Sequence, residues 1–174
     1  MEIKILSNKN EIDILKKIRY EVYNEEFRWF ETNNEKTESD EYDPFATHIM
    51  ILINNEPAGG VRIIWYDKCN LPALKNIPSN LAIEIVKKHK LAEISRIVVK
   101  KNFRKRQLGR TLLNIAIDLI KSKAYTAAIL DTFTEGPMTL KELYNEIGFR
   151  KISDDYEFKG PYCSLRSSVM LLEF

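Results

Sequence analysis

The sequence predicts a mixed α/β fold in which one central sheet combines antiparallel hairpins with a single parallel crossover. The apolar segments HIMILINN and AGGVRIIWY surround a turn at residues 54–57, so they predict a hairpin. Strand-like segments at residues 92–99 and 126–133 surround a helical one that begins near Leu108. A strand, a helix and a strand in that order form a right-handed crossover between parallel strands.

Apolar periodicity and capping residues place the remaining elements. Leu15, Ile18 and Val22 recur at helical spacing after Asn8 and Glu11, which are suited to cap a helix. The other expected elements are a strand at 3–6, an acidic loop at 31–43, a linker at 67–79, a helix at 80–88, a helix from a capping box at Thr139 and Glu142 to Gly148, and strands at 149–153 and 164–174.

Length and composition indicate a single domain that spans residues 1–174. Hydrophobic residues make up 44% and charged residues 30%, as is usual for soluble proteins, and the net charge of +2 argues against a nucleic-acid partner. No apolar run approaches the roughly 20 residues of a membrane span, and the N-terminus lacks the apolar core of a signal peptide. We therefore expect a cytoplasmic protein without a membrane partner, in which Cys69 and Cys163 are reduced thiols.

Charge is segregated along the chain despite the small net value. Residues 31–43 hold six acids and one base, whereas residues 100–110 hold six bases and no acid. Such segregation indicates local electrostatic work. His48 and His89 are isolated in the sequence, and no spacing typical of metal ligands is present, so no metal is expected.

The basic turn at Arg104–Arg110 has the sequence pattern of an anion site. A strand ends near Val98 and Val99 and a helix begins by Leu108, so backbone N–H groups and the positive end of the helix dipole face one place. Gly109 lets the backbone approach a phosphate closely. A solvated helix start and a nucleic-acid patch are the alternative interpretations. Three bases add long-range attraction for phosphate: Lys105, Arg106 and Arg110.

The segment VVKKNFRKRQLGRTLL resembles the acyl-CoA-binding motif of the GNAT superfamily of N-acetyltransferases. That motif reads Gln or Arg, two residues, Gly, one residue, then Gly or Ala. Arg104 matches its first position and Gly109 its last, whereas Gln107 replaces the first glycine. The resemblance implies a GNAT fold, with a central, mostly antiparallel sheet, one parallel crossover and helices on both faces. It also implies that an acyl-CoA donor contacts Val98, Val99, Arg104, Lys105, Arg106, Gln107, Leu108, Gly109 and Arg110.

A second segment, LYNEIGF at residues 143–149, resembles the C-terminal helix-to-strand motif of the same family. Tyr144 falls where many members carry a tyrosine that protonates the departing thiolate. The resemblance implies that Tyr144 is a general acid. The alternative is a half-buried aromatic residue on a short helix.

The N-terminal half resembles the autoinducer synthases, GNAT-fold enzymes that make acyl-homoserine lactones, and the related N-acyl amino acid synthases. The shared pattern is an arginine followed by two aromatic residues, a pair of aspartates three apart, a hairpin arginine and a Glu-x-x-Arg. In this chain the pattern corresponds to Arg19, Tyr23, Trp29, Asp40, Asp43, Arg62, Glu93 and Arg96, with Tyr23 in place of the usual phenylalanine. The resemblance implies that substrate contacts Arg19, Trp29, Asp40, Asp43, Arg62 and Arg96.

Glu93 is the candidate general base, acting directly or through a water. It precedes Arg104 by eleven residues, where several GNAT enzymes carry a catalytic carboxylate. An ion pair with Arg96 or Arg62 is the alternative role. Glu93 and Arg96 would lie on opposite faces of a regular strand, unless the bulge known in GNAT strands intervenes.

The implied donor is acetyl-CoA or a longer acyl-CoA, with an acyl-carrier protein as a further option, and the acceptor is the amine of a small molecule. Negative charge from Asp40 and Asp43 would favour a cationic amine, while Phe27, Trp29 and Phe30 would line an acyl pocket or pack in the core. Two alternatives remain: a synthase of the autoinducer or N-acyl amino acid type that uses a long-chain donor, and a non-catalytic acyl-CoA sensor. The oligomeric state stays open, with a homodimer as one option.

Overall fold

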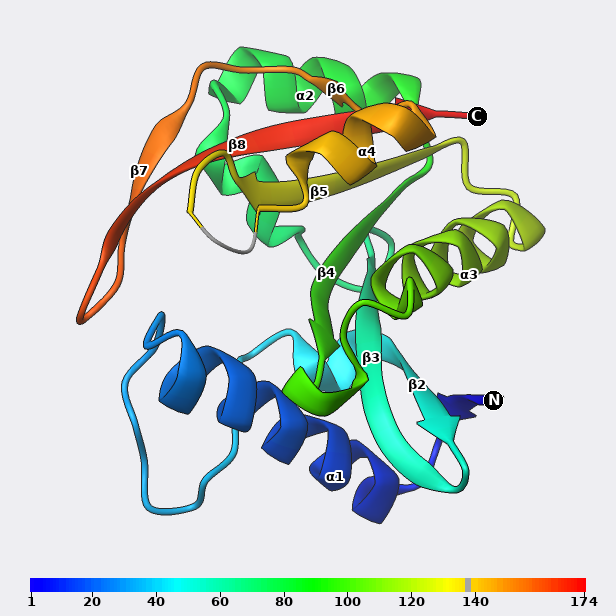
Figure 1. Cartoon of the computed structure of the whole chain (residues 1–174). Helices are drawn as coiled ribbons and strands as arrows, with labels where there is room; N and C mark the ends of the chain where they lie inside the picture. The colour runs from blue at the N-terminus through cyan, green and yellow to red at the C-terminus, as the bar shows by residue number, and fades with distance from the viewer. Residues whose placement is uncertain (137–138) are drawn as a thin grey trace. The chain divides into compact units, whose positions relative to one another are not determined.

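The computed structural model describes residues 1–136 and 139–174, which form a mixed α/β fold (Figure 1). The strands are β1 (Glu2–Leu6), β2 (Ala46–Ile53), β3 (Glu56–Trp65), β4 (Leu91–Val99), β5 (Ala127–Phe133), β6 (Arg150–Lys151), β7 (Tyr156–Lys159) and β8 (Ser164–Glu173). The α-helices are α1 (Lys9–Tyr20), α2 (Ser79–Lys88), α3 (Leu108–Ser122) and α4 (Lys141–Ile147). A π-helix, η1 (Glu21–Glu26), extends α1, and short 3-10 helices occur at η2 (Asp43–Phe45), η3 (Pro72–Asn76) and η4 (Lys101–Phe103).

Sheet topology confirms the predicted class. Within the described residues the sheet has eight strands in the order β1-β2-β3-β4-β5-β8-β6, and β7 pairs with β8. β4 and β5 pair in parallel over Leu91–Glu93 and Ala127–Ile129, on either side of α3, as the crossover requires. β1 with β2, and β8 with each of β5, β6 and β7, pair antiparallel.

Local sequence explains the turns that join these elements. Asn54 and Asn55 both adopt positive φ angles, 50° and 65°, between β2 and β3, and asparagine tolerates this backbone in a tight hairpin better than most residues. The Asn8 side chain accepts a hydrogen bond from the Asn10 N–H at 2.8 Å and so caps α1. Gly148, at φ 109°, ends α4 as predicted.

Three details differ from the sequence expectations. α4 begins at Lys141 after the cap residue Leu140, and the Thr139 hydroxyl accepts from the Lys141 N–H instead of forming the predicted capping box. The strand expected at 149–153 is only two residues long, and β7 was not predicted, because YEFK is too short and too polar to stand out.

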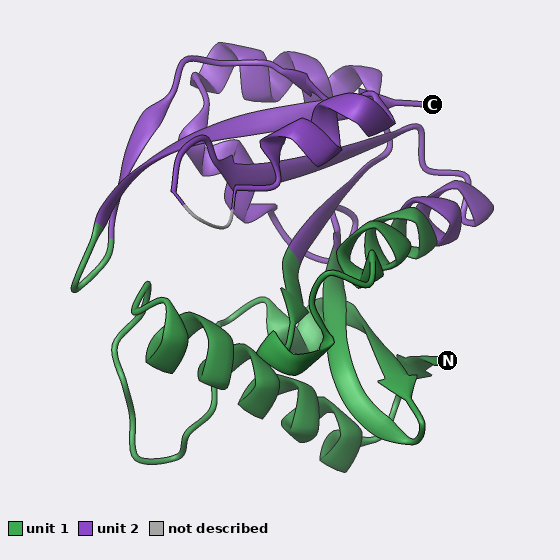
Figure 2. Cartoon of the chain, in the orientation of Figure 1, with its two compact units in different colours: residues 1–63, 96–116, 160–163 green, residues 64–95, 117–159, 164–174 purple. Residues whose placement is uncertain are grey.

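The described residues divide into two compact units (Figure 2). Unit 1 comprises residues 1–63, 96–116 and 160–163, and unit 2 comprises residues 64–95, 117–159 and 164–174. None of the helices in the described ranges combines the length and apolar character that crossing a membrane requires.

In unit 1 the apolar face of α1 packs on the sheet. Leu15 and Ile18 of α1 contact a cluster that includes Leu6 of β1, Met50 of β2 and Val98 of β4. Strand packing leaves no room for larger residues at the start of β3. A Cβ built on Gly59 would lie 2.3 Å from the Val98 carbonyl oxygen, so this glycine is required by the fold.

Unit 2 is built on β5 and β8, which pair along seven residues each. The segment η3 contacts both strands and α2. Leu71 and Ala73, which flank the start of η3, are fully buried, as are Ala127 and Val169 on the two strands. The η3 segment therefore covers part of the sheet, where the sequence indicated only a linker.

Candidate functional site

The basic turn forms an open helix N-terminus in unit 1. The first backbone bond of α3 runs from the Thr111 N–H to the Gln107 carbonyl at 3.0 Å, so the N–H groups before Thr111 have no carbonyl within the helix to accept them. Apart from Gly109 itself, its two chain neighbours and the adjoining helix backbone, no described atom lies within 4 Å of the place where a Cβ on Gly109 would stand. This geometry leaves room for an anion against the backbone and the positive end of the helix dipole.

Two residues of the turn adopt the left-handed backbone conformation. Lys105 has φ 61° and Gln107 has φ 58°, and both side chains are exposed. Gln107 stands where the family motif has its first glycine, and its φ gives the physical reason for glycine there. A residue with a Cβ pays roughly 1–2 kcal/mol of strain in this conformation.

Arg104, the first residue of the motif, is held by two contacts. Its guanidinium donates to both carboxylate oxygens of Glu26, at 2.6 Å each, and its Nε donates to the Val99 carbonyl at 3.0 Å. The hydrogen bond from Arg104 lowers the pKa of Glu26. The guanidinium also lies 5.2 Å from the ring centroid of Phe27. Glu26 thus pairs with the guanidinium that the sequence pattern assigns to the acyl-CoA donor.

A buried ion network fills unit 1 beside α1. Among the described residues it joins three arginines to three carboxylates: Arg19, Arg62 and Arg96 with Glu38, Asp40 and Asp43. Arg19 holds Asp43 with two hydrogen bonds of 3.0 and 2.6 Å, and its Nε lies 2.8 Å from a Glu38 oxygen. Arg62 contacts Asp40 at 2.6 Å and Asp43 at 3.0 Å.

The outer edge of the network is Arg96. Its Nε lies 2.9 Å from Glu38 and its NH2 group 3.0 Å from Asp40. Arg96 and Asp40 are partly exposed, whereas Arg19, Asp43 and Arg62 are buried. The structure therefore brings together five of the residues that the sequence assigned to substrate, and it adds Glu38, which the sequence did not single out.

Charge balance changes the electrostatic interpretation of this site. With three cations against three anions, Asp40 and Asp43 present no net negative charge to attract an amine. Burial acts to raise the pKa of Asp43, but the hydrogen bonds and charge of Arg19 and Arg62 hold that pKa well below its usual range. The same balance, with Arg62 and Arg96 as partners, lowers the pKa of Asp40.

His48 lies at the buried end of the network. Its Nε2 is 3.1 Å from the Asp43 carbonyl oxygen, and its Nδ1 is buried without a hydrogen-bond partner in the described ranges. Burial lowers the pKa of His48, an effect that Asp43 opposes and that the charges of Arg19 and Arg62 reinforce. The imidazole is therefore neutral in the folded protein near pH 7.

Trp29 belongs to an aromatic cluster that follows η1. Its ring stacks on Tyr23 at 5.4 Å and on Phe27 at 4.8 Å, and Phe30 meets Tyr23 edge-on at 6.2 Å. Tyr23 is buried and donates to the Ile97 carbonyl at 2.7 Å, while the rings of Phe27, Trp29 and Phe30 are half-buried. Arg96 lies 5.2 Å from the Phe30 ring centroid. The cluster offers apolar surface next to the exposed edge of the ion network.

Glu93 and Arg96 on β4 are separated by a distortion of the strand. Arg96 has φ 54°, which breaks the alternation of a regular strand as the expected bulge would. Glu93 is buried in unit 2, and its Oε2 accepts a hydrogen bond from the Ala73 N–H of η3 at 2.8 Å.

Tyr144 of α4 is also in unit 2 and is more buried than the sequence suggested. Only 6% of it is exposed, and its ring centroid is 5.8 Å from that of Phe149. Tyr144 and Glu93 remain proposed catalytic residues. No group of three or more His, Cys, Asp or Glu residues is placed to hold an ion in the part of the chain that the structure describes.

Comparison of the sequence with protein-family profiles identifies the family that has this fold and basic turn. The profile described as "Acetyltransferase (GNAT) domain" matches residues 18–114, more than half of the chain, and a second profile of the same description matches residues 82–162. The chain belongs to the GNAT acetyltransferase family. Membership confirms the resemblance drawn from the basic turn and from residues 143–149, and with it the prediction of an acyltransferase.

Several solved structures share the fold over nearly the whole chain. FeeM, an N-acyl amino acid synthase from uncultured soil microbes, superposes with a TM-score of 0.75 at 14% identity, over 99% of this chain and 95% of its own. ElaA of Escherichia coli gives 0.67 at 17% identity, over 99% of both chains. BjaI, a CoA-dependent acyl-homoserine lactone synthase solved with SAM and isopentyl-CoA, gives 0.64 at 16%, over 95% of this chain and 77% of its own. No curated protein sequence matches this GNAT chain.

Replacing Gln107 by glycine should stabilise the protein. The relief of left-handed strain, less the larger backbone entropy of glycine in the unfolded chain, predicts a gain of about 0.5–1 kcal/mol in the free energy of unfolding. Urea denaturation measures this gain. The matched control is Arg106→Gly, because Arg106 is exposed but does not have a positive φ, and it should destabilise. Destabilisation by Gln107→Gly would contradict the described turn.

Stability should fall as His48 is forced to take up a proton. Because its pKa is lowered on folding, the unfolded chain binds more protons below its unfolded pKa of about 6.5, and the free energy of unfolding decreases as the pH drops from about 7 to about 5. His48→Gln should flatten this dependence, whatever its effect at pH 7. The check is urea denaturation of both proteins across this range, and equal slopes would show that His48 is not responsible.

Proposed function

We propose that this protein transfers an acyl group from an acyl-CoA thioester to the primary amine of a small molecule. The observation that supports it best is the open N-terminus of α3, where Gly109 faces empty space after a turn with left-handed residues. In a GNAT chain, that position suits the pyrophosphate of coenzyme A. The donor would be acetyl-CoA or a longer acyl-CoA.

The roles within the donor site follow from the local geometry. Backbone N–H groups at the start of α3 would donate hydrogen bonds to the pyrophosphate, and the exposed bases Lys105 and Arg106 would attract it. The backbone of Val98 and Val99 would run beside the pantetheine arm. Arg104 would bind phosphate only after exchanging Glu26 for it, because both carboxylate oxygens now hold the guanidinium.

Acyl transfer to an ammonium needs proton transfers at both ends of the reaction. Glu93 would take a proton from the acceptor nitrogen, directly or through a water, as that nitrogen bonds to the thioester carbonyl carbon. The Ala73 N–H would fix its carboxylate in one orientation. Tyr144 would donate its phenolic proton to the departing thiolate, which prevents the thiolate from attacking the new amide.

The aromatic cluster supports a longer acyl donor as a second candidate. Phe27, Trp29 and Phe30 are half-buried and could cover an acyl chain, as a synthase of the autoinducer or N-acyl amino acid type would require. Arg96, Asp40 and Trp29 are exposed enough to touch such a substrate. The buried members of the network, Arg19, Asp43 and Arg62, would position these residues rather than bind substrate directly. An acyl-carrier protein is the alternative carrier of the chain.

Coenzyme A species should stabilise the protein against heat. At a ligand concentration about 100 times the dissociation constant, binding adds about 2.7 kcal/mol to the free energy of unfolding. The panel is CoA, acetyl-CoA, a long-chain acyl-CoA and an acyl-carrier protein thioester. Gly109→Val should abolish the shift while leaving the ligand-free protein folded, because its side chain would fill the empty space over the turn. Absence of a shift with every CoA and carrier species would refute the proposed donor, and the species that shifts most identifies the chain length.

Glu93→Gln and Tyr144→Phe should lower turnover and spare donor binding. General acid–base catalysis contributes about 100-fold or more, so acyl transfer to a panel of primary amines, followed by thiol release, should fall by that factor. The dissociation constant of CoA from calorimetry should not change. Glu84→Gln and Tyr162→Phe, at exposed positions, are the matched controls. Parallel loss of binding and turnover would mean that Glu93 and Tyr144 serve the fold.

A further inference from the structure

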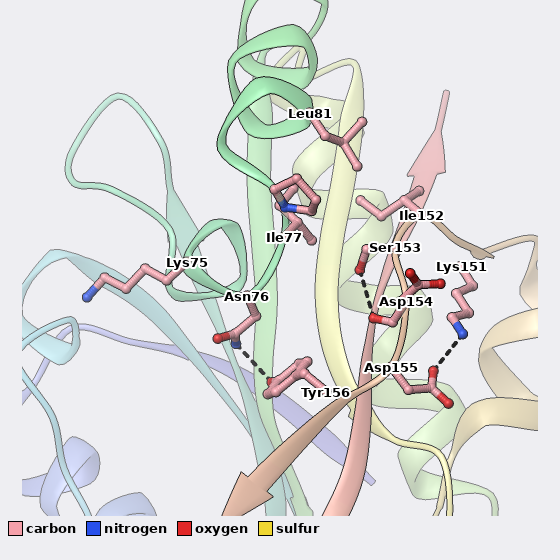
Figure 3. Close-up of a pocket in the computed structure, with 11 residues that line it drawn as sticks. Lys75, Asn76, Ile77, Leu81, Lys151, Ile152, Ser153, Asp154, Asp155 and Tyr156 are labelled. Atoms are coloured by element: carbon pink, nitrogen blue, oxygen red, sulfur yellow. Dashed lines mark hydrogen bonds and ion pairs between the residues drawn. The ribbon is translucent and has the colours of Figure 1, made fainter.

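Unit 2 contains a cavity of about 850 Å³, wide open to solvent, that the sequence did not indicate (Figure 3). Its size suits a small molecule. Its walls are η3 with the start of α2 on one side and the segment that leads into β7 on the other, and both carry apolar and polar side chains. The charged lining residues are Lys75, Lys151, Asp154 and Asp155, of which Lys151 and Asp155 form an ion pair at 2.7 Å. Its apolar lining residues include Ile77, Pro78, Leu81 and Ile152, and its neutral polar ones include Asn76 and Tyr156.

Asn76 and Tyr156 connect this cavity to a carboxylate behind them. The Asn76 amide donates to Asp131 Oδ2 and to the Tyr156 hydroxyl, at 2.8 Å each, and the Tyr156 hydroxyl donates to the same Asp131 oxygen. In Figure 3 the Asn76 amide points at the Tyr156 hydroxyl. The hydroxyl therefore bridges the cavity wall and the carboxylate.

Strand register explains why these side chains meet. Tyr156 of β7 lies opposite Ser167 of β8, which in turn lies opposite Phe133 of β5, so all three share one face of the sheet. Asp131 is two residues before Phe133 and points to the same face. Glu93, the proposed base, lies opposite Ile129, two residues before Asp131, and shares this face as well.

Asp131 differs from the carboxylates of the ion network. Its Oδ1 is buried and has no hydrogen-bond partner in the described ranges. Burial raises its pKa, and the groups that oppose this rise, Tyr156, Asn76 and the Thr132 backbone, are all neutral. Asp43, by contrast, is held by two arginines. Asp131 is thus a carboxylate that lacks a countercharge from its hydrogen-bonded neighbours and is disposed to take up a proton.

We propose that this cavity binds the acceptor as a primary ammonium on an apolar skeleton, and that Tyr156 relays one proton from its nitrogen to Asp131. In this step an N–H bond of the ammonium breaks as the Tyr156 oxygen gains that proton, and the O–H proton of Tyr156 passes to Asp131 Oδ2. The amine becomes neutral, tyrosine is regenerated and Asp131 becomes a neutral acid. The apolar side chains of Ile77, Leu81 and Ile152 hold the skeleton.

This inference rests on the proposed acyl transfer and extends it. Conversion of an ammonium to an amide removes two protons from the nitrogen, so a single proton-accepting group is not enough. Glu93 and Asp131 share one face of the sheet and supply two carboxylates for this purpose. Tyr156 touches the substrate, whereas Asp131 acts through Tyr156 and is a positioning and proton-accepting residue.

Binding is tested on the 174-residue chain saturated with CoA, with phenethylammonium as the probe. Amide and side-chain NMR shifts should change most at Asn76, Leu81, Ile152 and Tyr156. Methylammonium, which lacks the apolar skeleton, and phenethyl alcohol, which lacks the charge, should both bind more weakly. Shifts located elsewhere, no shifts, or equal binding of the alcohol would overturn the proposed cavity.

The relay is tested by amine-dependent release of CoA from acetyl-CoA, measured against pH. Tyr156→Phe and Asp131→Asn should each lower this rate about 100-fold, and Asp131→Asn should also move the acid limb of the pH profile. Tyr162→Phe and Asp118→Asn are the matched controls, an exposed tyrosine and an exposed carboxylate that do not line the cavity, and both should retain the wild-type rate and profile. If Asp131→Asn does not fold, the rate of CoA release by the more conservative variant Tyr156→Phe tests the relay.

The outcomes separate this inference from the proposed function. Full activity of Tyr156→Phe, or an unchanged acid limb in a folded Asp131→Asn, would overturn the relay while leaving CoA-dependent transfer intact. Wild-type protein that binds CoA but does not acylate phenethylamine would also overturn it. Failure of the wild-type protein to bind any CoA species would instead overturn the proposed function.

Discussion

The fold of unit 1 depends on the pairing of three arginines with three carboxylates beside α1. Burying a single charge without a partner is so unfavourable that loss of one member of such a pair typically costs about 3–5 kcal/mol. The network ties α1 to the acidic loop through Arg19, and ties the loop to β3 and β4 through Arg62 and Arg96. A segment with little apolar content is thereby held in place by charge rather than by a hydrophobic core.

This pairing bears on where the acceptor amine binds. Asp40 and Asp43 are the carboxylates that the resemblance to autoinducer synthases highlights, yet their charges are matched within the protein. In unit 2, Asp131 is surrounded by neutral donors and keeps one oxygen without a partner in the described ranges. Whether a carboxylate can attract a cationic amine therefore depends on the countercharges near it in the folded protein. The number of acids in a segment of sequence does not reveal those countercharges.

Sequence patterns predicted most of the fold, but they predicted the site residues only where the signal is local. Helical periodicity, the Asn54–Asn55 turn and the crossover were readable because they are local. Glu38 was not, because nothing in the acidic run distinguishes it from Glu35 or Glu41 until the loop folds back on Arg19. The pairing of Asp131 with Tyr156 depends on the register of β7 against β8, and YEFK carries no signal strong enough to fix it.

The pairing of Arg104 with Glu26 has a thermodynamic consequence for the donor site. Glu26 closes η1 and is followed directly by the aromatic cluster, so the carboxylate that would have to leave Arg104 belongs to the segment that carries Phe27 and Trp29. Separating Glu26 from Arg104 costs free energy. An anion that has to separate this pair binds more weakly by the same amount. The affinity of the turn for an anion and the conformational order of the segment that carries Phe27 and Trp29 therefore report the same coupling free energy.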